Sequence, residues 1–367
     1  MKFIDEFRQP ETVRRLADQI TETAARVDGA VRIMEVCGGH TMAIHRFGLP
    51  SLLPDNIELL SGPGCPVCVT PTTYVDRAIG LVAGDSVTLT TFGDLYRVSG
   101  SEETLEDAAG RGVDARVVYS PRDALKLASD NPDRTVVFLA VGFETTAPVV
   151  AASVQEAARR GIDNFRVMSG HKTMPPALRA LVEAPEVALD GFLLPGHVST
   201  IIGTEPYRFL AEEFNLACCV TGFEPADMLR GIASVVAQRA DERSEVDNEY
   251  RRVVNRQGNP TAGGIVADIF EPADSQWRGL GMIPDSGLTV RSEWQDFSID
   301  PPDPTIPSKG NSACRCDEVL RGLAKPPDCE LFGKACTPDS AVGPCMVSSE
   351  GACAAYYKYG TGKANLE

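Results

Sequence analysis

The sequence predicts an α/β protein with two small parallel-sheet α/β domains facing across a cleft and a C-terminal α+β domain rich in cysteine. Two observations predict this class. Apolar segments typical of strands alternate with helical segments at intervals of about 20–30 residues, as in consecutive βαβ units. The predicted strands also end in loops of Gly, Cys, His or Glu. In parallel sheets such strand ends share one crevice where ligands bind.

Length and composition limit the possible functions. The chain has 367 residues, enough for two or three domains with their own cores. Its 51 acidic and 35 basic residues give a net charge of −16 without a basic run, so nucleic acid and anionic membranes are poor partners. The N-terminus lacks a signal-peptide core, and no apolar run reaches the ~20 residues that span a bilayer. We therefore expect a cytoplasmic protein whose eleven cysteines serve metals or redox chemistry.

The elements follow in order from the periodicity of apolar residues. A first helix is predicted to begin at Pro10, with its apolar face reaching Val27. A long helical segment is predicted from Pro225 to about Gln257. Eight parallel strands are predicted between these helices, at 31–36, 57–60, 86–91, 115–119, 135–141, 165–168, 191–194 and 217–220. Short antiparallel strands are predicted at 263–270 and 280–291, and a stiff Pro-rich linker at 301–307.

A faint internal similarity predicts how these elements form domains. Segments 36–43 and 141–148 both pass from a strand to a helix through small residues. Segments 61–64 and 169–172 each lead to a Pro-containing helix start, although chance similarity explains these matches equally well. The predicted domains are 28–130, 131–235, and 236–367 together with the N-terminal helix at 1–27.

The first strand ends in Cys37, followed by Gly38, Gly39 and His40. The glycines let the backbone approach a ligand closely. A helix is expected to begin near Thr41, and the free N–H groups and dipole of a helix start lower the pKa of a thiol. The alternative is a small buried cysteine beside a histidine with satisfied hydrogen bonds. We interpret Cys37 and His40 as a metal-binding pair.

The second strand leads to a C-x-x-C motif formed by Cys65 and Cys68. This spacing suits either half of a zinc site or a dithiol that closes into a disulfide. A zinc site needs a second pair, and the one-residue spacing of Cys314 and Cys316 is a poor match. We therefore interpret the motif as a redox dithiol.

The tail carries six cysteines. Structural zinc modules usually contain tight C-x2–4-C pairs, which this run lacks. An iron–sulfur cubane takes one thiolate at each of its four irons, so its ligands can be widely spaced, although this spacing differs from the bacterial ferredoxin run. The predicted cluster ligands are Cys329, Cys336, Cys345 and Cys353, with Cys314 and Cys316 in reserve.

Three more residues lie in strand-exit loops. Glu144 precedes two threonines at a predicted helix start, where it either binds a cation or moves protons, or simply caps the helix. His171 and His197 occupy equivalent loops, in which a neutral imidazole can contact a metal or ligand. The candidate catalytic residues are therefore Cys37, His40, Cys65, Cys68, Glu144, His171 and His197.

Five motifs in this order resemble the HypD family of hydrogenase maturation factors. They lie at 37–41, 62–68, 142–146, 195–199 and 343–353. The resemblance covers nearly the whole chain and implies two α/β domains with a third that carries a [4Fe–4S] cluster. It also implies a scaffold on which the Fe(CN)2CO unit of [NiFe]-hydrogenases is assembled, with redox activity of its own.

The resemblance further implies roles for individual residues. The cysteine at position 37 would hold the iron together with the N-terminal cysteine of a small HypC-type chaperone. Cys65 and Cys68 would perform thiol redox chemistry, with electrons from a cluster similar to that of ferredoxin:thioredoxin reductases. Cyanide would arrive as a thiocyanate carried by a HypE-type partner. Low-spin Fe(II) with cyanide and CO favours soft thiolate donors, which agrees with Cys37 as its ligand.

Two other functions remain open from the sequence. The chain can instead be a cluster-dependent thiol/disulfide reductase acting on a protein or a small molecule, in which Cys37 is dispensable while Cys65 and Cys68 are not. In the third interpretation, the tail is a zinc module and the cleft binds a small metabolite.

Overall fold

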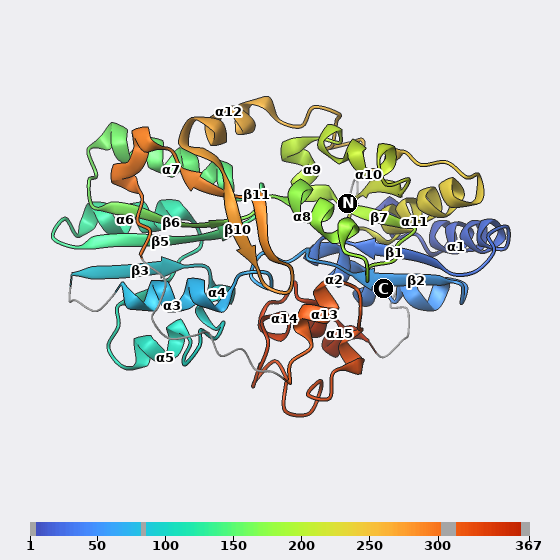
Figure 1. Cartoon of the computed structure of the whole chain (residues 1–367), viewed down its shortest axis with the longest axis horizontal. Coiled ribbons are helices and arrows are strands. Elements are labelled where there is room, and N and C mark those ends of the chain that lie inside the picture. Colours follow the sequence, from blue (N-terminus) through green and yellow to red (C-terminus); the bar gives the residue numbers. More distant parts are fainter. Residues whose placement is uncertain (1–4, 82–85, 302–312, 361–367) are drawn as a thin grey trace.

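The computed structural model describes residues 5–81, 86–301 and 313–360, and it contains two parallel sheets (Figure 1). The five-stranded sheet has the order β2-β1-β7-β8-β9, and the four-stranded sheet has the order β4-β3-β5-β6. The strands are β1 (Val31–Glu35), β2 (Ile57–Ser61), β3 (Val87–Thr91), β4 (Ala115–Val117), β5 (Thr135–Gly142), β6 (Phe165–His171), β7 (Gly191–Pro195), β8 (Ala217–Thr221) and β9 (Val246–Asn248). The predicted α/β class and all eight predicted parallel strands are confirmed.

Helices precede and connect these strands, as expected for parallel neighbours. They are α1 (Pro10–Ala24), α2 (Gly38–Arg46), α3 (Thr72–Gly80), α4 (Gly93–Tyr96), α5 (Leu105–Gly110), α6 (Pro121–Asp130), α7 (Ala147–Arg160), α8 (Met174–Glu183), α9 (Gly196–Ile202), α10 (Arg208–Glu212) and α11 (Pro225–Ala240). Short 3₁₀ helices are η1 (Asp5–Phe7), η2 (Leu49–Leu52), η3 (Glu205–Tyr207), η4 (Ser292–Phe297) and η5 (Pro326–Asp328). Among the described residues, no helix is both long and apolar enough to cross a membrane.

The expected domains at 28–130 and 131–235 do not match the two sheets. The five-stranded sheet contains strands from before and after residue 130, and so does the four-stranded sheet. Strand β1 pairs with β7, with Ile33 opposite Gly191, while β3 pairs with β5. The chain therefore leaves the five-stranded sheet after β2, builds the four-stranded sheet, and returns at β7. Strands β1 and β7 are almost wholly buried, and such apolar strands need a neighbour on both edges.

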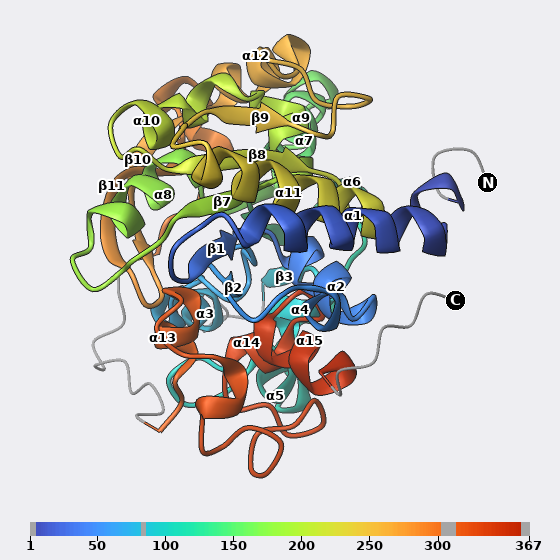
Figure 2. The same cartoon turned by 90° about the vertical axis from the view of Figure 1, so that its right-hand side faces the viewer.

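The N-terminal helix belongs to the five-stranded sheet rather than to the C-terminal domain expected at 236–367. The side chains of Val13, Leu16 and Ile20 are buried in one core cluster with Ile33 and Met228. Helix α1 lies alongside α11 (Figure 2). Its apolar stripe matches the predicted spacing, but periodicity alone does not say which surface the stripe covers.

The segment after α11 differs partly from the prediction. Helix α11 ends at Ala240, and residues 263–270, expected as a strand, lie mostly in α12 (Pro260–Ile269). The side chain of Asn259 accepts a hydrogen bond from the amide of Ala262, and Pro260 occupies the first turn, which together start a helix. Strands β10 (Phe270–Trp277) and β11 (Gly281–Val290) form the expected antiparallel pair. The predicted linker at 301–307 lies, beyond Pro301, outside the described residues.

Residues 313–360 form a small unit that we call the tail module. It contains α13 (Cys316–Leu320), α14 (Pro344–Val347) and α15 (Ala352–Tyr359). Figure 1 shows it below the two sheets, close to the tip of the β10–β11 hairpin. Its Cys316, Leu320 and Cys345 are buried in the same core cluster as Cys65 and Cys68, so the tail module packs against the C-x-x-C loop.

Candidate functional site

A cavity of about 430 Å³ lies where the strand ends of both sheets meet. We call it the Cys37 cavity. It is lined by Val36, Cys37, Gly64, Pro66, Val67, Phe92, Gly93, Asp94, Val141, Gly142, Phe143, Thr145, Thr146, Pro195, His197, Val198 and Glu350. The structure therefore places Cys37, the C-x-x-C loop and His197 at one cavity, as the shared crevice of parallel strand ends predicts.

Cys37 is half-buried and directly precedes the nine-residue helix α2. Burial, together with the negative fields of Glu350 and Glu35, raises the pKa of its thiol to about 12. The expectation that the helix start makes this thiol acidic is therefore wrong, because desolvation and two carboxyls outweigh the dipole of a short helix. A cation bound here would compensate the burial of the thiolate.

Glu35 is a buried carboxyl next to Cys37 that sequence reasoning missed. It is 2% exposed, and it accepts hydrogen bonds from the Cys37 amide at 3.1 Å and from the Thr41 hydroxyl at 2.5 Å. Burial raises its pKa to about 8. A single acidic residue in an otherwise apolar strand, directly before the strand exit, is the signal that could have identified it.

Glu350 and Asp94 also line the cavity, and neither was predicted as a site residue. The Asp94 carboxylate accepts hydrogen bonds from the Ser348 hydroxyl at 2.8 Å and from the Ser349 amide at 3.3 Å. Burial raises the pKa of Glu350, and so does the charge of Asp94. Glu350 belongs to the 343–353 motif, whereas Asp94 lies in the loop after the strand predicted at 86–91, so only the fold brings these distant segments together.

Gly64 allows the second strand exit to pass against Cys37. A β-carbon at Gly64 would lie 2.2 Å from the Cys37 nitrogen, so Gly64→Ala should push the two loops apart. We expect a loss of about 1–3 kcal/mol in the free energy of unfolding, measured by denaturant titration. Gly110→Ala is the control, because a β-carbon there meets nothing within 4 Å. Equal effects of the two changes would contradict this packing.

Cys65 and Cys68 form a disulfide and are both buried. Pro66 and Val67 line the Cys37 cavity, and the two cysteines are buried in the same core cluster as Cys316 and Cys345. The Cys68 sulfur is 3.8 Å from the carbonyl oxygen of Pro344, the residue before Cys345. The pair therefore lies between the Cys37 cavity and the tail cysteines.

All six tail cysteines line one small apolar cavity, with neighbours such as Phe332 and Met346. Cys345, expected as a cluster ligand, is disulfide-bonded to Cys316 and is not free to bind iron in this state. The four unpaired thiols at this cavity are Cys314, Cys329, Cys336 and Cys353, which include the reserve residue Cys314 and exclude Cys345.

These four thiols fit an iron–sulfur cubane in number and surroundings. Burial raises the pKa of Cys314 and of Cys353, and the neighbouring thiols raise both further. Thiols crowded in an apolar cavity need a cation to hold them as thiolates. Across the described ranges, no three His, Cys, Asp or Glu side chains converge as a site for a single metal ion.

His40 lies behind the cavity wall rather than on it. The ring is fully buried, and its Nε2 donates to the Thr221 carbonyl at 3.2 Å. Its Nδ1 has no hydrogen-bond partner among the described residues, and burial lowers its pKa to about 3. His197 is exposed, and its ring stacks on that of Phe223 with 4.0 Å between the ring centroids, so His197 rather than His40 lines the cavity beside Cys37.

Glu144 is buried and does not cap its own helix. One carboxylate oxygen accepts a hydrogen bond from the amide of Met174 at 2.7 Å, at the start of α8. The other oxygen has no partner within the described part of the chain. Burial raises its pKa from 4.5 to about 7. Glu144 thus accepts a hydrogen bond from a free backbone amide at the start of α8, the helix of the next βα unit.

This pKa predicts a pH dependence of stability. Because the folded-state pKa is raised, Glu144 stabilises the fold below pH 4.5, and this contribution is lost as the pH rises through 7. Between these values the wild type should lose up to about 3 kcal/mol of unfolding free energy relative to Glu144→Gln. Denaturant unfolding of both proteins at several pH values measures the difference. Parallel curves would contradict it.

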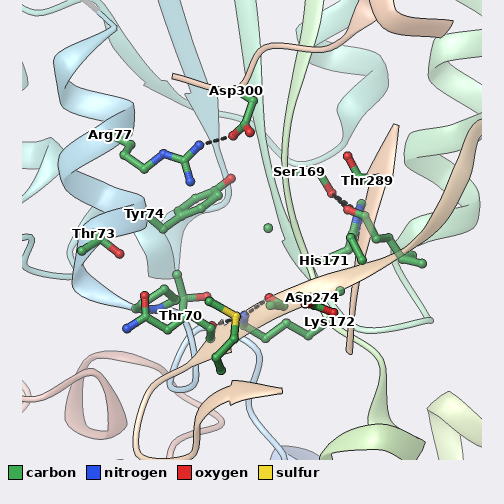
Figure 3. A pocket seen from close by; sticks show the side chains of 18 of the residues that line it. Thr70, Thr73, Tyr74, Arg77, Ser169, His171, Lys172, Asp274, Thr289 and Asp300 are labelled. Carbon is green, nitrogen blue, oxygen red and sulfur yellow. Dashed lines mark hydrogen bonds and ion pairs between the residues drawn. The ribbon is translucent and has the colours of Figure 1, made fainter. Parts of the chain in front are cut away.

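His171 lies in a second cavity of about 300 Å³, not at the Cys37 cavity. His171 and Lys172 lie across this space from Tyr74 and Arg77 (Figure 3). The Lys172 ammonium donates to the Ser275 hydroxyl at 2.8 Å, which ties the end of β6 to the hairpin. The expected equivalence of His171 and His197 fails because their strands belong to different sheets.

Comparison with known proteins agrees with these motifs. The HypD family model, described as "Hydrogenase formation hypA family", matches residues 11–360. The chain is 47% identical over 366 residues to the hydrogenase maturation factor HypD of Escherichia coli (strain K12), covering 98% of each. It is 46% identical over 370 residues to HypD of Rhizobium leguminosarum bv. viciae, covering 98% of this chain and 96% of that protein. The chain therefore belongs to the HypD family.

Proposed function

We propose that this chain is a cytoplasmic hydrogenase maturation factor on which the Fe(CN)2CO unit is assembled. The iron is its cargo, held by the Cys37 sulfur together with a cysteine of a small HypC-type chaperone. The observation that carries this proposal is the position of Cys37 on the wall of a 430 Å³ cavity reached by strand exits of both sheets. Membership of the HypD family supports it.

The surroundings of Cys37 suit a cationic cargo. Cys37, Glu350 and Asp94 line one cavity, and Glu35 lies behind the Cys37 amide. Burying several anionic groups together is costly unless a cation compensates them. The same carboxyls that disfavour a free Cys37 thiolate would therefore favour its iron complex. His197 is the exposed imidazole on the same wall and would contact the iron or its ligands.

A [4Fe–4S] cluster is proposed in the tail module, bound by Cys314, Cys329, Cys336 and Cys353. When bound, it would supply electrons one at a time, whereas reduction of the Cys65–Cys68 disulfide takes two electrons and two protons. The Cys68 sulfur lies 3.8 Å from Pro344 of the tail module, which supports transfer between them. Oxidation of the dithiol back to the disulfide would supply the two electrons and two protons that cleave the S–C bond of the thiocyanate, leaving a thiol on the HypE-type partner and releasing hydrogen cyanide.

Anaerobic co-purification with the small chaperone tests this function. We expect a brown protein containing a cluster with iron and sulfide, plus additional iron that is lost when the chaperone is omitted. Zinc in place of iron and sulfide would refute the cluster and favour a zinc module.

A second function, a cluster-dependent thiol/disulfide reductase, is favoured by the buried disulfide packed against the tail module. The two functions differ in their need for Cys37. A reductase would still reduce its substrate in the Cys37→Ala variant, whereas the scaffold would lose its iron.

A further inference from the structure

Arg278 lies between the two redox elements, directly after β10 at the hairpin tip. Its backbone amide donates to the Val69 carbonyl at 2.8 Å, and its Nε donates to the Thr70 carbonyl at 3.1 Å. Both carbonyls follow Cys68 in the chain. One arginine therefore fixes the segment that leaves the C-x-x-C motif, through its main chain and its side chain.

The other end of the guanidinium points toward the tail module. Arg278 lines a cavity of about 280 Å³ together with Gly343 and Pro344. Among the described residues its Nη2 is buried without a hydrogen-bond partner, and Glu102 lines the same cavity. The next residue, Gly279, passes so close to α13 that a β-carbon would lie 3.0 Å from the Cα of Asp317.

The charge of this arginine acts on one tail cysteine, Cys314. Burial lowers the pKa of Arg278, while the charges of Asp317 and of a Cys314 thiolate raise it. A guanidinium stays protonated even when desolvated. Its positive charge therefore acts on the Cys314 thiolate of the tail module as well as on the carboxylate of Asp317.

We propose that Arg278 positions the C-x-x-C loop against the tail module and raises the reduction potential of the cluster bound there. The inference rests on the proposed function, since it assumes a cluster at Cys314, Cys329, Cys336 and Cys353. Reduction adds one electron to the cluster and makes it more negative. A fixed cation nearby stabilises the reduced form more than the oxidised form, because net charge around a cluster sets its potential.

Anaerobic redox titration followed by electron paramagnetic resonance tests the charge effect. In Arg278→Gln, the ratio of reduced to oxidised cluster at a fixed potential should fall on the order of tenfold, which is ~59 mV for one electron. Arg278→Lys should stay close to wild type because it keeps the charge. Arg291→Gln is the control, since Arg291 lies at the open end of the hairpin.

The outcomes separate the inference from the proposed function. An unshifted potential in Arg278→Gln, or equal shifts in the Gln and Lys variants, would overturn the role of the charge. A wild-type protein without any cluster would instead refute the proposed function and the inference with it. If Arg278→Gln does not fold, Arg278→Met keeps the aliphatic stem while removing the charge and gives the same comparison.

Discussion

Replacing Cys37 by Ala should remove the iron bound outside the cluster while leaving the absorbance of the cluster unchanged. The side chain of Cys37 supplies the sulfur on the cavity wall, and the carboxyl groups around it are hard ligands that low-spin iron with cyanide and CO does not favour. The complex with the small chaperone should therefore keep only its cluster iron. Iron and sulfide analysis of the purified complex measures this loss.

Cys219→Ala is the matched control for the loss of a thiol. Cys219 is fully buried in β8 and its sulfur lies 3.5 Å from the Val220 carbonyl, away from the Cys37 cavity. This variant should keep the additional iron. If Cys37→Ala also keeps it, the chain does not hold its cargo through this sulfur, and the reductase function is favoured.

Replacing Cys314 by Ala should bleach the cluster and destabilise the tail module. Cys314 is one of the four unpaired thiols at the tail cavity, and a metal centre that joins distant segments contributes directly to folding energy. We expect a loss of several kcal/mol for the tail module, seen as a lower unfolding temperature and as proteolysis within 313–360. Absorbance of the anaerobic protein measures the cluster.

Comparing Cys314→Ala with Cys345→Ala distinguishes the two possible sets of cluster ligands. Cys345 is bonded to Cys316, so its replacement should leave the cluster absorbance intact and release a free thiol at Cys316. The ligand set first expected from the sequence predicts the opposite result: the cluster absorbance would be lost in Cys345→Ala and kept in Cys314→Ala. Bleaching by Cys345→Ala alone would show that the disulfide-bonded arrangement does not represent the cluster-bound state.

The sequence predicted which segments are strands better than it predicted how the strands pair. Apolar runs that end in Gly-rich turns located all eight parallel strands, but periodicity carries no information about which edge of a strand meets which partner. The burial of β1 and β7 requires a neighbour on both edges, but it does not select β7 as the partner of β1. The helix at 260–269 was missed because Asn259 and Pro260 act as a start signal that outweighs the apolar run.

The sequence predicted which loops meet at the site, but it did not predict the burial, the pKa or the disulfide pairing of the cysteines there. Cys37, His197 and the C-x-x-C loop meet because parallel strand ends meet, which the order of the motifs already implies. The raised pKa of Cys37 depends on burial and on Glu350, which comes from the distant tail module. Likewise, the disulfide between Cys316 and Cys345 depends on how α13 packs against α14, and spacing alone could not select it.

The infrared spectrum of the wild-type protein, isolated anaerobically with its small chaperone, tests the central claim most directly. Cyanide and carbonyl stretching bands should be present in the complex and absent from the complex made with Cys37→Ala. A wild-type complex without these bands, or bands of equal strength in both complexes, would contradict iron assembly on Cys37.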